Sequence, residues 1–461
     1  MNKYQPIIGM EIHIELKTAS KMFCGCKNDP FHAPKPNVYT CPVCLGLPGA
    51  LPVANKKAIE WTVMLGLALN CKINQLSKFD RKHYFYPDLP KGYQISQYDL
   101  PFCFDGKIST SFGDVRIRRI HLEEDTGKLI HDTVNGKKVS LIDFNRSGVP
   151  LIEIVTEPDI KSAAQAKEYA KKLYQIIRYL DISDADMEKG QMRLEANISL
   201  INQKSKIKNQ KDKLPNYKVE LKNINSFRFL EKAIEAEIKR QEKILDEGKT
   251  PHQETRGYNA EKNITYLQRS KEDAADYRYF PDPDIPPIRI DDHWLSKIKN
   301  LLPENFDNLI ERWHKQYQVD KVLVSLLFET KHQSQWIETL LLEAKKQNLD
   351  TGKLVNFLAN KKLKVILFKD DYKQILTSFK QATTTNQVDE KELDKAIDQV
   401  INNNPQAIKD YQSGKKNALN FLLGQTMKIL KKRIDTNLIL DKLKTQISKP
   451  PQTWSKLKTT T

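Results

Sequence analysis

The 461-residue sequence contains no continuous apolar run of about 18 residues, the shortest that would form a membrane-spanning helix. Its N-terminus also lacks the basic, apolar and small-residue segments of a secretory signal peptide, because an alternating apolar run begins almost at once, at Ile7 to Leu16. We therefore expect a cytoplasmic protein with no membrane association. Hydrophobic residues still make up 39% of the chain and aromatic residues 8%, which is enough for folded cores and argues against global disorder.

Two common nucleotide-binding patterns are also missing, namely the GxxxxGK[ST] phosphate loop and the Rossmann GxGxxG turn. Any use of ATP must therefore depend on another kind of site. Cysteine is absent beyond residue 103, so all six cysteines are clustered near the N-terminus. In a cytoplasmic protein, such clustering indicates metal binding rather than disulfide bonds.

Four of the cysteines form two close pairs, CGC and CPVC, with fourteen residues between them. Two such pairs can place four thiolates in a tetrahedron around Zn²⁺, and a site with four protein ligands leaves no position open for catalysis. We predict a structural zinc site, with buried or redox-active thiols as the alternative. The predicted ligands are Cys24, Cys26, Cys41 and Cys44. The isolated Cys71 and Cys103 are expected to be buried packing residues.

The chain changes character near residue 290. Before it, apolar periodicity predicts strands at Ile7–Leu16, Val115–Leu122, Ser140–Phe144, Leu151–Val155, Met192–Leu200 and Tyr217–Leu221, and helices at about 55–69, 162–180 and 226–246. Ser162 and Ser226 are the expected N-caps of the last two helices. After it, helical patterns dominate. We predict an α+β fold with a mixed α/β domain (1–292), an all-helical connector (293–395) and a small helical tail domain (396–461).

Positive charge is concentrated in the tail. The whole chain has a formal net charge of +17, and residues 411–461 carry eleven Lys or Arg against two Asp, a net +9. A polyanionic partner would select such a cluster, although a lysine-rich proteome, solubility or an anionic membrane would also account for it. The basic residues of interest are Lys415, Lys416, Lys428, Lys431, Lys432 and Arg433.

Acidic residues and a histidine occupy strand positions where burial is costly. In GMEIHIE, alternation places Glu11, His13 and Glu15 on one face of the predicted strand. Glu153 lies inside the apolar run LIEIV, and Glu195 lies inside MRLEAN. Converging carboxylates repel one another unless a cation joins them, and oxygen-rich sites of this kind suit Mg²⁺ and nucleotide phosphates. Structural ion pairs with Arg146, Arg193 and Lys222 are the competing interpretation.

The stretch KFDRKHYFYPDLPKGYQ, from Lys78 to Gln94, interleaves cations with aromatic residues. Nucleobases stack on aromatic rings while Lys and Arg meet phosphates, so this stretch is a candidate nucleic-acid contact. An aromatic-rich core loop with exposed charges explains it equally well.

These segments together resemble the GatB subunit of aspartyl/glutamyl-tRNA amidotransferases over nearly the whole chain. The similar motifs are GMEIHIEL with the following KTxSKMF, SKFDRKHYFYPD (Ser77–Asp88), QISQYD (Gln94–Asp99), HLEEDTGK (His121–Lys128), DFNRSGVPLIEIVTEPD (Asp143–Asp159), EANISL (Glu195–Leu200), ELKNINSF (Glu220–Phe227), DYRYFPDPD (Asp276–Asp284) and GKKNALNFLLGQTMK (Gly414–Lys428). They are long and they follow one another in order, which excludes coincidence.

The resemblance implies an enzyme of three different subunits, in which an amidase frees ammonia from glutamine and a third, small polypeptide wraps the interface. The GatB subunit would bind mischarged Glu-tRNA(Gln) or Asp-tRNA(Asn), phosphorylate the side-chain carboxylate with ATP, and allow ammonia to displace phosphate. The family also implies a cradle-like catalytic domain and a helical tail that grips the tRNA. The basic residues of the tail would make that contact. Composition and resemblance therefore agree on the tail.

The resemblance also implies roles for individual residues. Glu11, His13, Glu124 and Glu153 match the family's catalytic, Mg²⁺ and nucleotide site, to which we add Arg146 for the nucleotide. Lys82 and Lys91 match residues that line the path of ammonia, and we hypothesise that burial lowers the pKa of such a lysine so that it relays protons. Many members have Asp where this chain has Glu195, which leaves the catalytic role of Glu195 in doubt. The alternative function is a non-catalytic, zinc-containing tRNA-binding scaffold.

Overall fold

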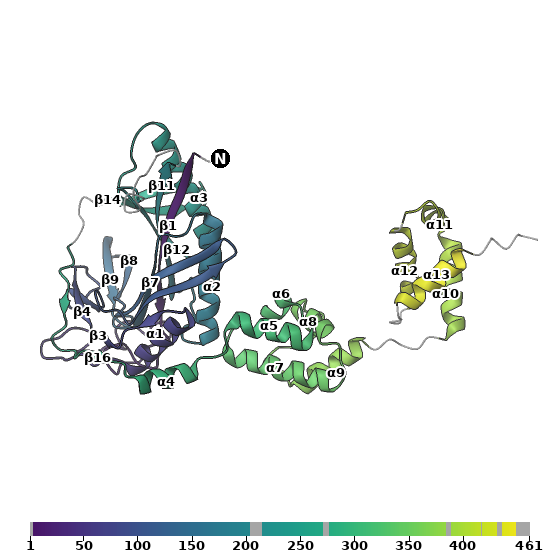
Figure 1. The fold of residues 1–461 in the computed structure, drawn as a ribbon, viewed down its shortest axis with the longest axis horizontal. Helices are drawn as coiled ribbons and strands as arrows, with labels where there is room; N and C mark the ends of the chain where they lie inside the picture. The colour runs from purple at the N-terminus through teal and green to yellow at the C-terminus, as the bar shows by residue number, and fades with distance from the viewer. Residues whose placement is uncertain are drawn as a thin grey trace, which may run out of the picture. The chain divides into compact units, whose positions relative to one another are not determined.

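The computed structural model describes residues 3–202, 214–270, 276–383, 389–415, 417–430 and 436–448. Contact clustering divides the chain into two compact units. The first comprises residues 1–316 and 324–337, and the second comprises residues 317–323 and 338–461. Figure 1 labels the elements of both units.

A nine-stranded sheet forms the centre of the first unit, in the order β14-β13-β12-β11-β1-β10-β7-β6-β2 (Figure 1). Its strands are β1 (Tyr4–Glu15), β2 (Lys72–Ile73), β6 (Cys103–Thr110), β7 (Gly113–Glu124), β10 (Pro150–Thr156), β11 (Met192–Asn202), β12 (Val219–Ile224), β13 (Glu254–Asn259) and β14 (Ile264–Ser270). All neighbouring pairs are antiparallel except β12 and β13, which are parallel. The long β1 therefore lies in the middle of the sheet.

Three helices pack against the sheet: α1 (Lys56–Ala68), α2 (Ala163–Leu180) and α3 (Phe227–Asp246). The side chains of Ser162 and Ser226 accept hydrogen bonds from the third residue that follows each of them, so both predicted N-caps are confirmed. The apolar side of β1, with Met10, Ile12 and Ile14, is buried in the core that the helices share with the sheet. The other side of β1 is left to the polar residues.

Three small sheets join the large one. They pair β15 (Phe280–Pro281), β4 (Asp80–His83) and β5 (Tyr93–Ser96); β16 (Ile288–Arg289) with β3 (Leu76–Ser77); and β8 (Lys128–Val134) with β9 (Lys137–Asp143). The segment 276–284 is held to β4 by Arg81, which pairs with Asp282 at 2.8 Å and Asp284 at 2.9 Å. Arg81 also lies over the ring of Tyr93, 4.4 Å from its centroid. Much of the aromatic stretch therefore packs within the fold, although Phe85 is 90% exposed.

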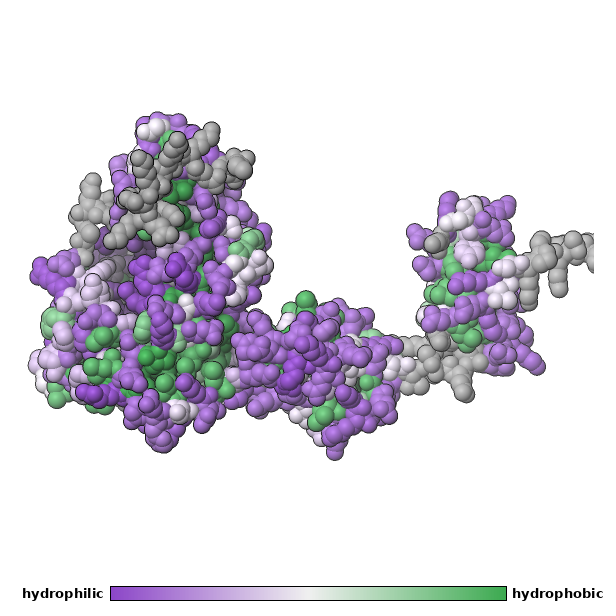
Figure 2. Space-filling model, viewed as in Figure 1, coloured by the Kyte–Doolittle hydropathy of each residue, from purple (hydrophilic) through white to green (hydrophobic). Residues whose placement is uncertain are grey.

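Only helices follow β16 in the described part of the chain. They are α4 (Asp292–Leu301), α5 (Phe306–Tyr317), α6 (Lys321–Ser325), α7 (Lys331–Lys346), α8 (Thr351–Ala359), α9 (Tyr372–Thr383), α10 (Glu390–Asn403), α11 (Pro405–Gln412), α12 (Asn417–Leu430) and α13 (Thr436–Ile447). Helices α10, α12 and α13 share a core that includes Ile397, Leu422 and Leu443. In Figure 2 the surface over α5 to α8 is mainly hydrophilic. No described helix is both long and apolar enough to cross a bilayer.

The predicted α+β class is confirmed, since a mixed sheet with helices is followed by helices alone in the described residues. The predicted strands and helices of the first 250 residues also match observed elements, with shifts of a few residues at their ends. The hairpin of β13 and β14 was not expected. The division at residues 292 and 395 stays a prediction.

Candidate active site and metal centres

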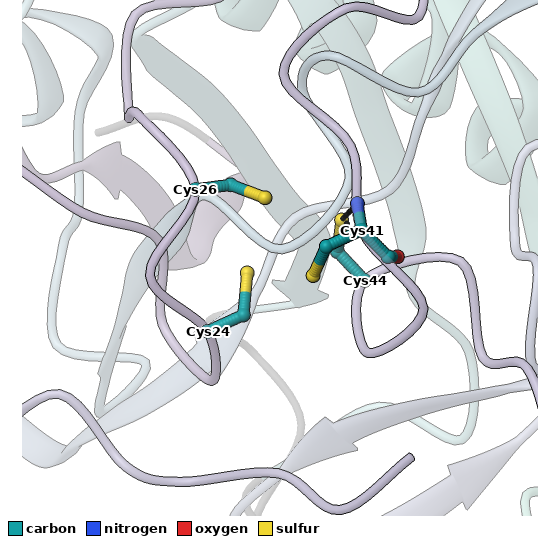
Figure 3. Close-up of side chains that lie close together, drawn as sticks. All are labelled: Cys24, Cys26, Cys41 and Cys44. Carbon is teal, nitrogen blue, oxygen red and sulfur yellow. Dashed lines mark hydrogen bonds between the residues drawn. The ribbon is translucent and has the colours of Figure 1, made fainter. Parts of the chain in front are cut away.

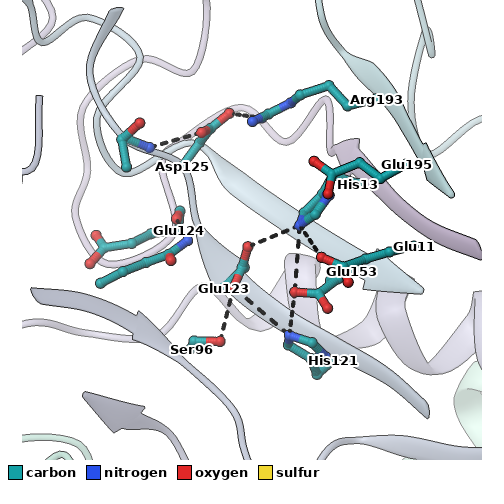
Figure 4. Close-up of polar contacts among 12 residues, drawn as sticks. Glu11, His13, Ser96, His121, Glu123, Glu124, Asp125, Glu153, Arg193 and Glu195 are labelled. Carbon is teal, nitrogen blue, oxygen red and sulfur yellow. Dashed lines mark hydrogen bonds and ion pairs between the residues drawn. The ribbon is translucent and has the colours of Figure 1, made fainter. Parts of the chain in front are cut away.

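The face of the sheet opposite the apolar side of β1 carries a row of polar side chains. His13 in β1 lies opposite Glu153 in β10, and Glu153 lies opposite His121 in β7. Because alternate residues of a strand share a face, Glu11 and Glu123 point to the same side, each two residues from a member of this row. Three neighbouring strands therefore bring five ligand-type side chains together (Figure 4).

Glu153 is the centre of this cluster. One of its carboxylate oxygens, Oε2, lies 3.0 Å from Nε2 of His121 and 3.5 Å from Nε2 of His13. The same His13 nitrogen lies 3.8 Å from Glu123 and 3.9 Å from Glu11. Two ligand groups result, Glu11–His13–Glu153 and His121–Glu123–Glu153, and within each group the ligand atoms lie within 4.8 Å of one another. Glu153 belongs to both groups.

Electrostatics in the cluster are those of crowded carboxylates. Burial, with the charge of Glu153, raises the pKa of Glu11 to about 7. Burial lowers the pKa of His13, but hydrogen bonding and ion pairing with Glu153 outweigh it and raise that pKa to about 9. Burial also opposes ionisation of Glu153, yet His121 and His13 hold its pKa well below the usual range. Protonated imidazoles thus balance the carboxylates, and a divalent cation would take over this charge and release protons.

Unsatisfied polar atoms support a cation at this position. The Nδ1 atoms of His13 and His121 are buried without a hydrogen-bond partner among the described residues. Buried polar atoms normally have partners, so their absence indicates that ligands or water complete the site. Ser96 donates a hydrogen bond of 2.9 Å to Glu123 and orients its carboxylate. Carboxylates that share a site with phosphates are what Mg²⁺ uses in proteins, so the residues fit this ion.

Glu124 does not join this cluster, contrary to the prediction. It is the last residue of β7 and points to the opposite side from Glu123, because consecutive strand residues face opposite ways (Figure 4). Its carboxylate lies 2.6 Å from Nζ of Lys91 and accepts a hydrogen bond from the backbone N–H of Ile95. The resemblance covers both acidic residues of this motif, and the strand geometry assigns Glu123 to the cluster.

Arg146 is also engaged elsewhere. Its guanidinium donates to the carbonyl oxygens of Thr126 at 3.0 Å and Gly127 at 2.7 Å, and it lies 3.8 Å from Asp125. Asp125 in turn pairs with Arg193. The structure therefore places Arg146 in a neighbouring ion-pair network, as the competing interpretation from the sequence had it.

Glu195 lies beside the cluster with a partner of its own. It stands opposite Glu11 across β1 and β11, and Nζ of Lys222 lies 3.0 Å from its Oε2. Its negative charge contributes to the raised pKa of Glu11, after burial and the charge of Glu153. A ligand role for Glu195 stays a prediction.

The two lysines assigned to the ammonia path contact different groups. Nζ of Lys82 lies 4.9 Å from the centroid of the Tyr277 ring. Burial lowers the pKa of Lys82, but the charges of Glu123 and Glu153 outweigh burial and leave the pKa above its ordinary value. The hypothesised fall of this pKa on burial is therefore not found. Lys91 pairs with Glu124 instead.

The four predicted zinc ligands converge (Figure 3). The sulfur atoms of Cys24, Cys26, Cys41 and Cys44 all lie within 4.8 Å of one another. Tetrahedral coordination with zinc–sulfur bonds of about 2.3 Å needs sulfur atoms about 3.8 Å apart, so the loops need only a small contraction. None of the four is in a disulfide, and the residues fit the ion. Cys71 and Cys103 are buried, as expected.

Lys21 adds a buried positive charge next to these thiols. Its side chain is 0% exposed, and Nζ donates to the carbonyl oxygens of Tyr39 at 2.6 Å and Phe144 at 3.2 Å. The same atom lies 3.8 Å from the sulfur of Cys44. A hydrogen bond from Cys24, together with the Lys21 charge, lowers the pKa of Cys44 to about 5 against the effect of burial. This environment favours thiolates, which are the form that binds metal.

Two predicted tail residues are described. Lys415 and Lys428 are both exposed, and Lys415 pairs with Asp410 at 3.2 Å. The other four, Lys416, Lys431, Lys432 and Arg433, lie outside the described residues.

Comparisons with known proteins agree with this architecture. A family model described as the GatB/GatE catalytic domain matches residues 6–296, and one described as the GatB domain matches residues 346–447. The chain belongs to the GatB/GatE family.

Similar relatives are named as the B-type polypeptides of aspartyl/glutamyl-tRNA(Asn/Gln) amidotransferases. The protein of Thermodesulfovibrio yellowstonii is 41% identical over 95% of this chain and 98% of its own. That of Thermotoga maritima is 41% identical over 96% and 99%, and that of a Thermoanaerobacter species is 40% identical over 97% and 100%. Their name marks each of these relatives as one chain of an amidotransferase that has several.

Proposed function

We propose that the chain is the GatB subunit of a tRNA-dependent amidotransferase. It would use ATP to phosphorylate the side-chain carboxylate of Glu-tRNA(Gln), Asp-tRNA(Asn) or both, and would then form the amide with ammonia that a partner amidase releases from glutamine. A third, small polypeptide would complete the assembly. The observation that carries this proposal is the cluster of three carboxylates and two imidazoles around Glu153, in a chain of this family.

The chemistry requires an activated carboxyl group, because a carboxylate does not react with ammonia at neutral pH. A side-chain oxygen of the aminoacyl group attacks the γ-phosphorus of ATP, and ADP leaves with the electron pair of the broken bond. Ammonia then attacks the acyl carbon, phosphate departs, and one proton is lost from nitrogen. Mg²⁺ bound by Glu11, His13, Glu153, His121 and Glu123 would orient the phosphates and neutralise their charge. The protein residues supply position and charge.

Trapping the activated carboxyl group tests this proposal. Hydroxylamine in place of glutamine should yield tRNA-bound hydroxamate with the complete assembly, in amounts that depend on both ATP and mischarged tRNA. Correctly charged Gln-tRNA(Gln) is the matched control and should give none. Hydroxamate formation that does not require ATP would rule the phosphorylation step out.

We also propose that Lys91 and Glu124 lie on the path of ammonia, with Lys82 at its end beside the cluster. Glu124 and Lys91 line a pocket together with Cys44, Gly46 and other residues of the cysteine loops. An ion pair at 2.6 Å in this position would have to open or shift for a small molecule to pass. A route through the protein would keep ammonia from solvent and from protonation.

The cysteine loop forms the bed on which Lys91 lies. Gly46 has a φ of +66°, and a methyl group there would fall 2.4 Å from Cγ of Lys91. Gly49 has a φ of +82°, with nothing within 4 Å of the corresponding position. Alanine costs about 1–2 kcal/mol of backbone strain at either glycine, so the two variants differ chiefly in what they do to Lys91.

We therefore expect Gly46→Ala to lower glutamine-supported amidation roughly tenfold or more below Gly49→Ala, since misplaced groups are costly in reactions that depend on position. Both variants should retain their zinc. Amidation rates of the two assemblies, measured beside their zinc contents, check this prediction. Equal rates would show that the loop does not position Lys91.

A structural zinc ion is proposed at the four cysteines. We expect about one zinc per chain, and Cys26→Ser should lose it and lower the midpoint of thermal unfolding by about 5 °C or more, because metal binding contributes to folding. Cys71→Ala removes a cysteine outside the cluster and should keep the zinc. Metal analysis and thermal unfolding of the two variants check this prediction. Full zinc content in Cys26→Ser would contradict it.

The exposed Lys415 and Lys428, together with Lys416, Lys431, Lys432 and Arg433, are proposed to contact the tRNA outside the active site. Phosphate contacts of this kind depend on salt and carry little sequence information.

A further inference from the structure

Arg119 is a cation without an acidic partner at the edge of the cluster. It shares a face of β7 with His121 and Glu123, since the three alternate along the strand. It lies opposite Val155 of β10, and Val155 lies opposite Glu11 of β1, so Arg119 and Glu11 belong to one row across the sheet. Arg119 is therefore placed beside the ligands proposed for Mg²⁺.

The guanidinium of Arg119 has unused hydrogen-bonding capacity. Its Nε is buried and has no hydrogen-bond partner, and the described part of the chain provides no acid within ion-pair distance. Burying a cationic group without a partner costs free energy that an anion would recover. The electrostatic surroundings are those of the cluster. Burial raises the pKa of Tyr279 to about 12, with Glu123 and Glu153 adding to it and with Lys82 and Arg119 opposing it.

The neighbouring arginines of β7 show how this strand treats cations that serve the fold. Arg118 forms two hydrogen bonds of 2.9 Å with Glu157, and Arg116 forms two of 2.8 Å with Asp159. Both are bidentate pairs on the protein surface. The pairing of β7 with β10 shifts register between Arg119 and these two residues, which separates them from the row of the cluster. Arg119 is the exception among the three, and it is the one that stands in a row with the carboxylates.

We propose that Arg119 binds a phosphate group of the nucleotide whose γ-phosphoryl is transferred. This inference rests on the proposed function. A planar guanidinium offers paired donors that match phosphate oxygens, and it keeps its charge at all physiological pH values. In the transfer, the bond between the γ-phosphorus and the β,γ-bridging oxygen breaks while the bond to the aminoacyl carboxylate oxygen forms. Negative charge on the phosphate oxygens during this step is what a fixed cation stabilises.

The test compares Arg119→Gln with Arg118→Gln in the complete assembly. The two variants remove the same charge from adjacent residues of one strand, but the guanidinium of Arg118 already has a carboxylate partner. Binding of a non-hydrolysable ATP analogue with Mg²⁺ is measured by calorimetry, binding of mischarged tRNA by filter retention, and kcat and KM for ATP by phosphate release. Arg119→Lys, which keeps the charge but not the fork, is the third variant, and it provides the comparison if Arg119→Gln fails to assemble.

Arg119→Gln is expected to weaken binding of the analogue about tenfold or more and to lower kcat about 10²-fold, with tRNA affinity unchanged. Arg118→Gln should stay within about twofold of the wild type, as exposed pairs contribute little. Arg119→Lys should recover part of the loss. Unchanged analogue affinity and kcat in Arg119→Gln would overturn the proposal, and so would a loss confined to tRNA affinity, which would assign the phosphate to the tRNA. Failure of the proposed function itself would appear separately, as a wild-type assembly without tRNA-dependent phosphate release.

Discussion

Glu153→Gln is expected to lower tRNA-dependent ATP turnover of the assembled enzyme by at least about 10²-fold. Glu153 is the only described carboxylate that belongs to both ligand groups, and its Oε2 lies 3.0 Å from His121 and 3.5 Å from His13. Glutamine keeps the shape of the side chain but removes the charge that both imidazoles and a cation require. Phosphate release in the presence of mischarged tRNA measures the effect.

Glu157→Gln is the matched control for this variant. Glu157 follows the end of the same strand, and its carboxylate forms an ion pair with Arg118 at 2.9 Å on the surface. Loss of an exposed pair costs at most about 1 kcal/mol, so ATP turnover should change by less than about twofold. Equal losses in both variants would mean that the cluster around Glu153 has no special part in the reaction. Thermal unfolding of each assembly shows whether the fold is intact.

Glu123→Gln and Glu124→Gln are expected to produce different defects, although the residues are adjacent. Glu123→Gln should lower tRNA-dependent ATP turnover about 10²-fold, because its carboxylate faces the cluster. Glu124→Gln should preserve most of that turnover and instead lower the fraction of released phosphate that yields amide, because Glu124 pairs with Lys91 beside the pocket. Phosphate and amidated tRNA are measured in the same reaction.

Equal loss of ATP turnover in the two variants would contradict this assignment. It would return Glu124 to the nucleotide site, where its motif alone had placed it. An additional amidation assay with ammonium chloride separates delivery of ammonia from chemistry, because high external ammonia should partly rescue Glu124→Gln but not Glu123→Gln.

Local patterns were sufficient to predict much of the fold. The alternation in β1 correctly separated Met10, Ile12 and Ile14 from Glu11 and His13. These residues obey a period of two over a long strand, and the rule needs no knowledge of neighbouring strands. The two cysteine pairs were equally clear, since their spacing alone suggests a common ligand.

Features that depend on register or on distant segments were missed. Two adjacent acids end β7, and only the strand geometry decides which of them, Glu123 or Glu124, faces His13. Lys21 is buried by carbonyl oxygens from residues 39 and 144, which no local pattern connects with it. The alternation that relates Arg119 to His121 was visible in the sequence, but its lack of an acidic partner was not.

The hairpin of β13 and β14 was missed for a different reason. These strands contain polar residues and Gly257 where apolar alternation would normally be found. Their stability comes from side-chain pairing with α3, in which Thr265 donates a hydrogen bond of 2.7 Å to the fully buried Glu237 and Arg256 lies 3.5 Å from it. Such tertiary pairing overrides local propensity.

The most direct test of the central claim is phosphate release from ATP by this chain assembled with its amidase and small partner polypeptides, with and without Glu-tRNA(Gln) or Asp-tRNA(Asn). We predict release that requires a mischarged tRNA, and the tRNA that supports it identifies the substrate. An assembly that binds mischarged tRNA but releases no phosphate in response would contradict the claim, and would favour a tRNA-binding scaffold without catalytic activity.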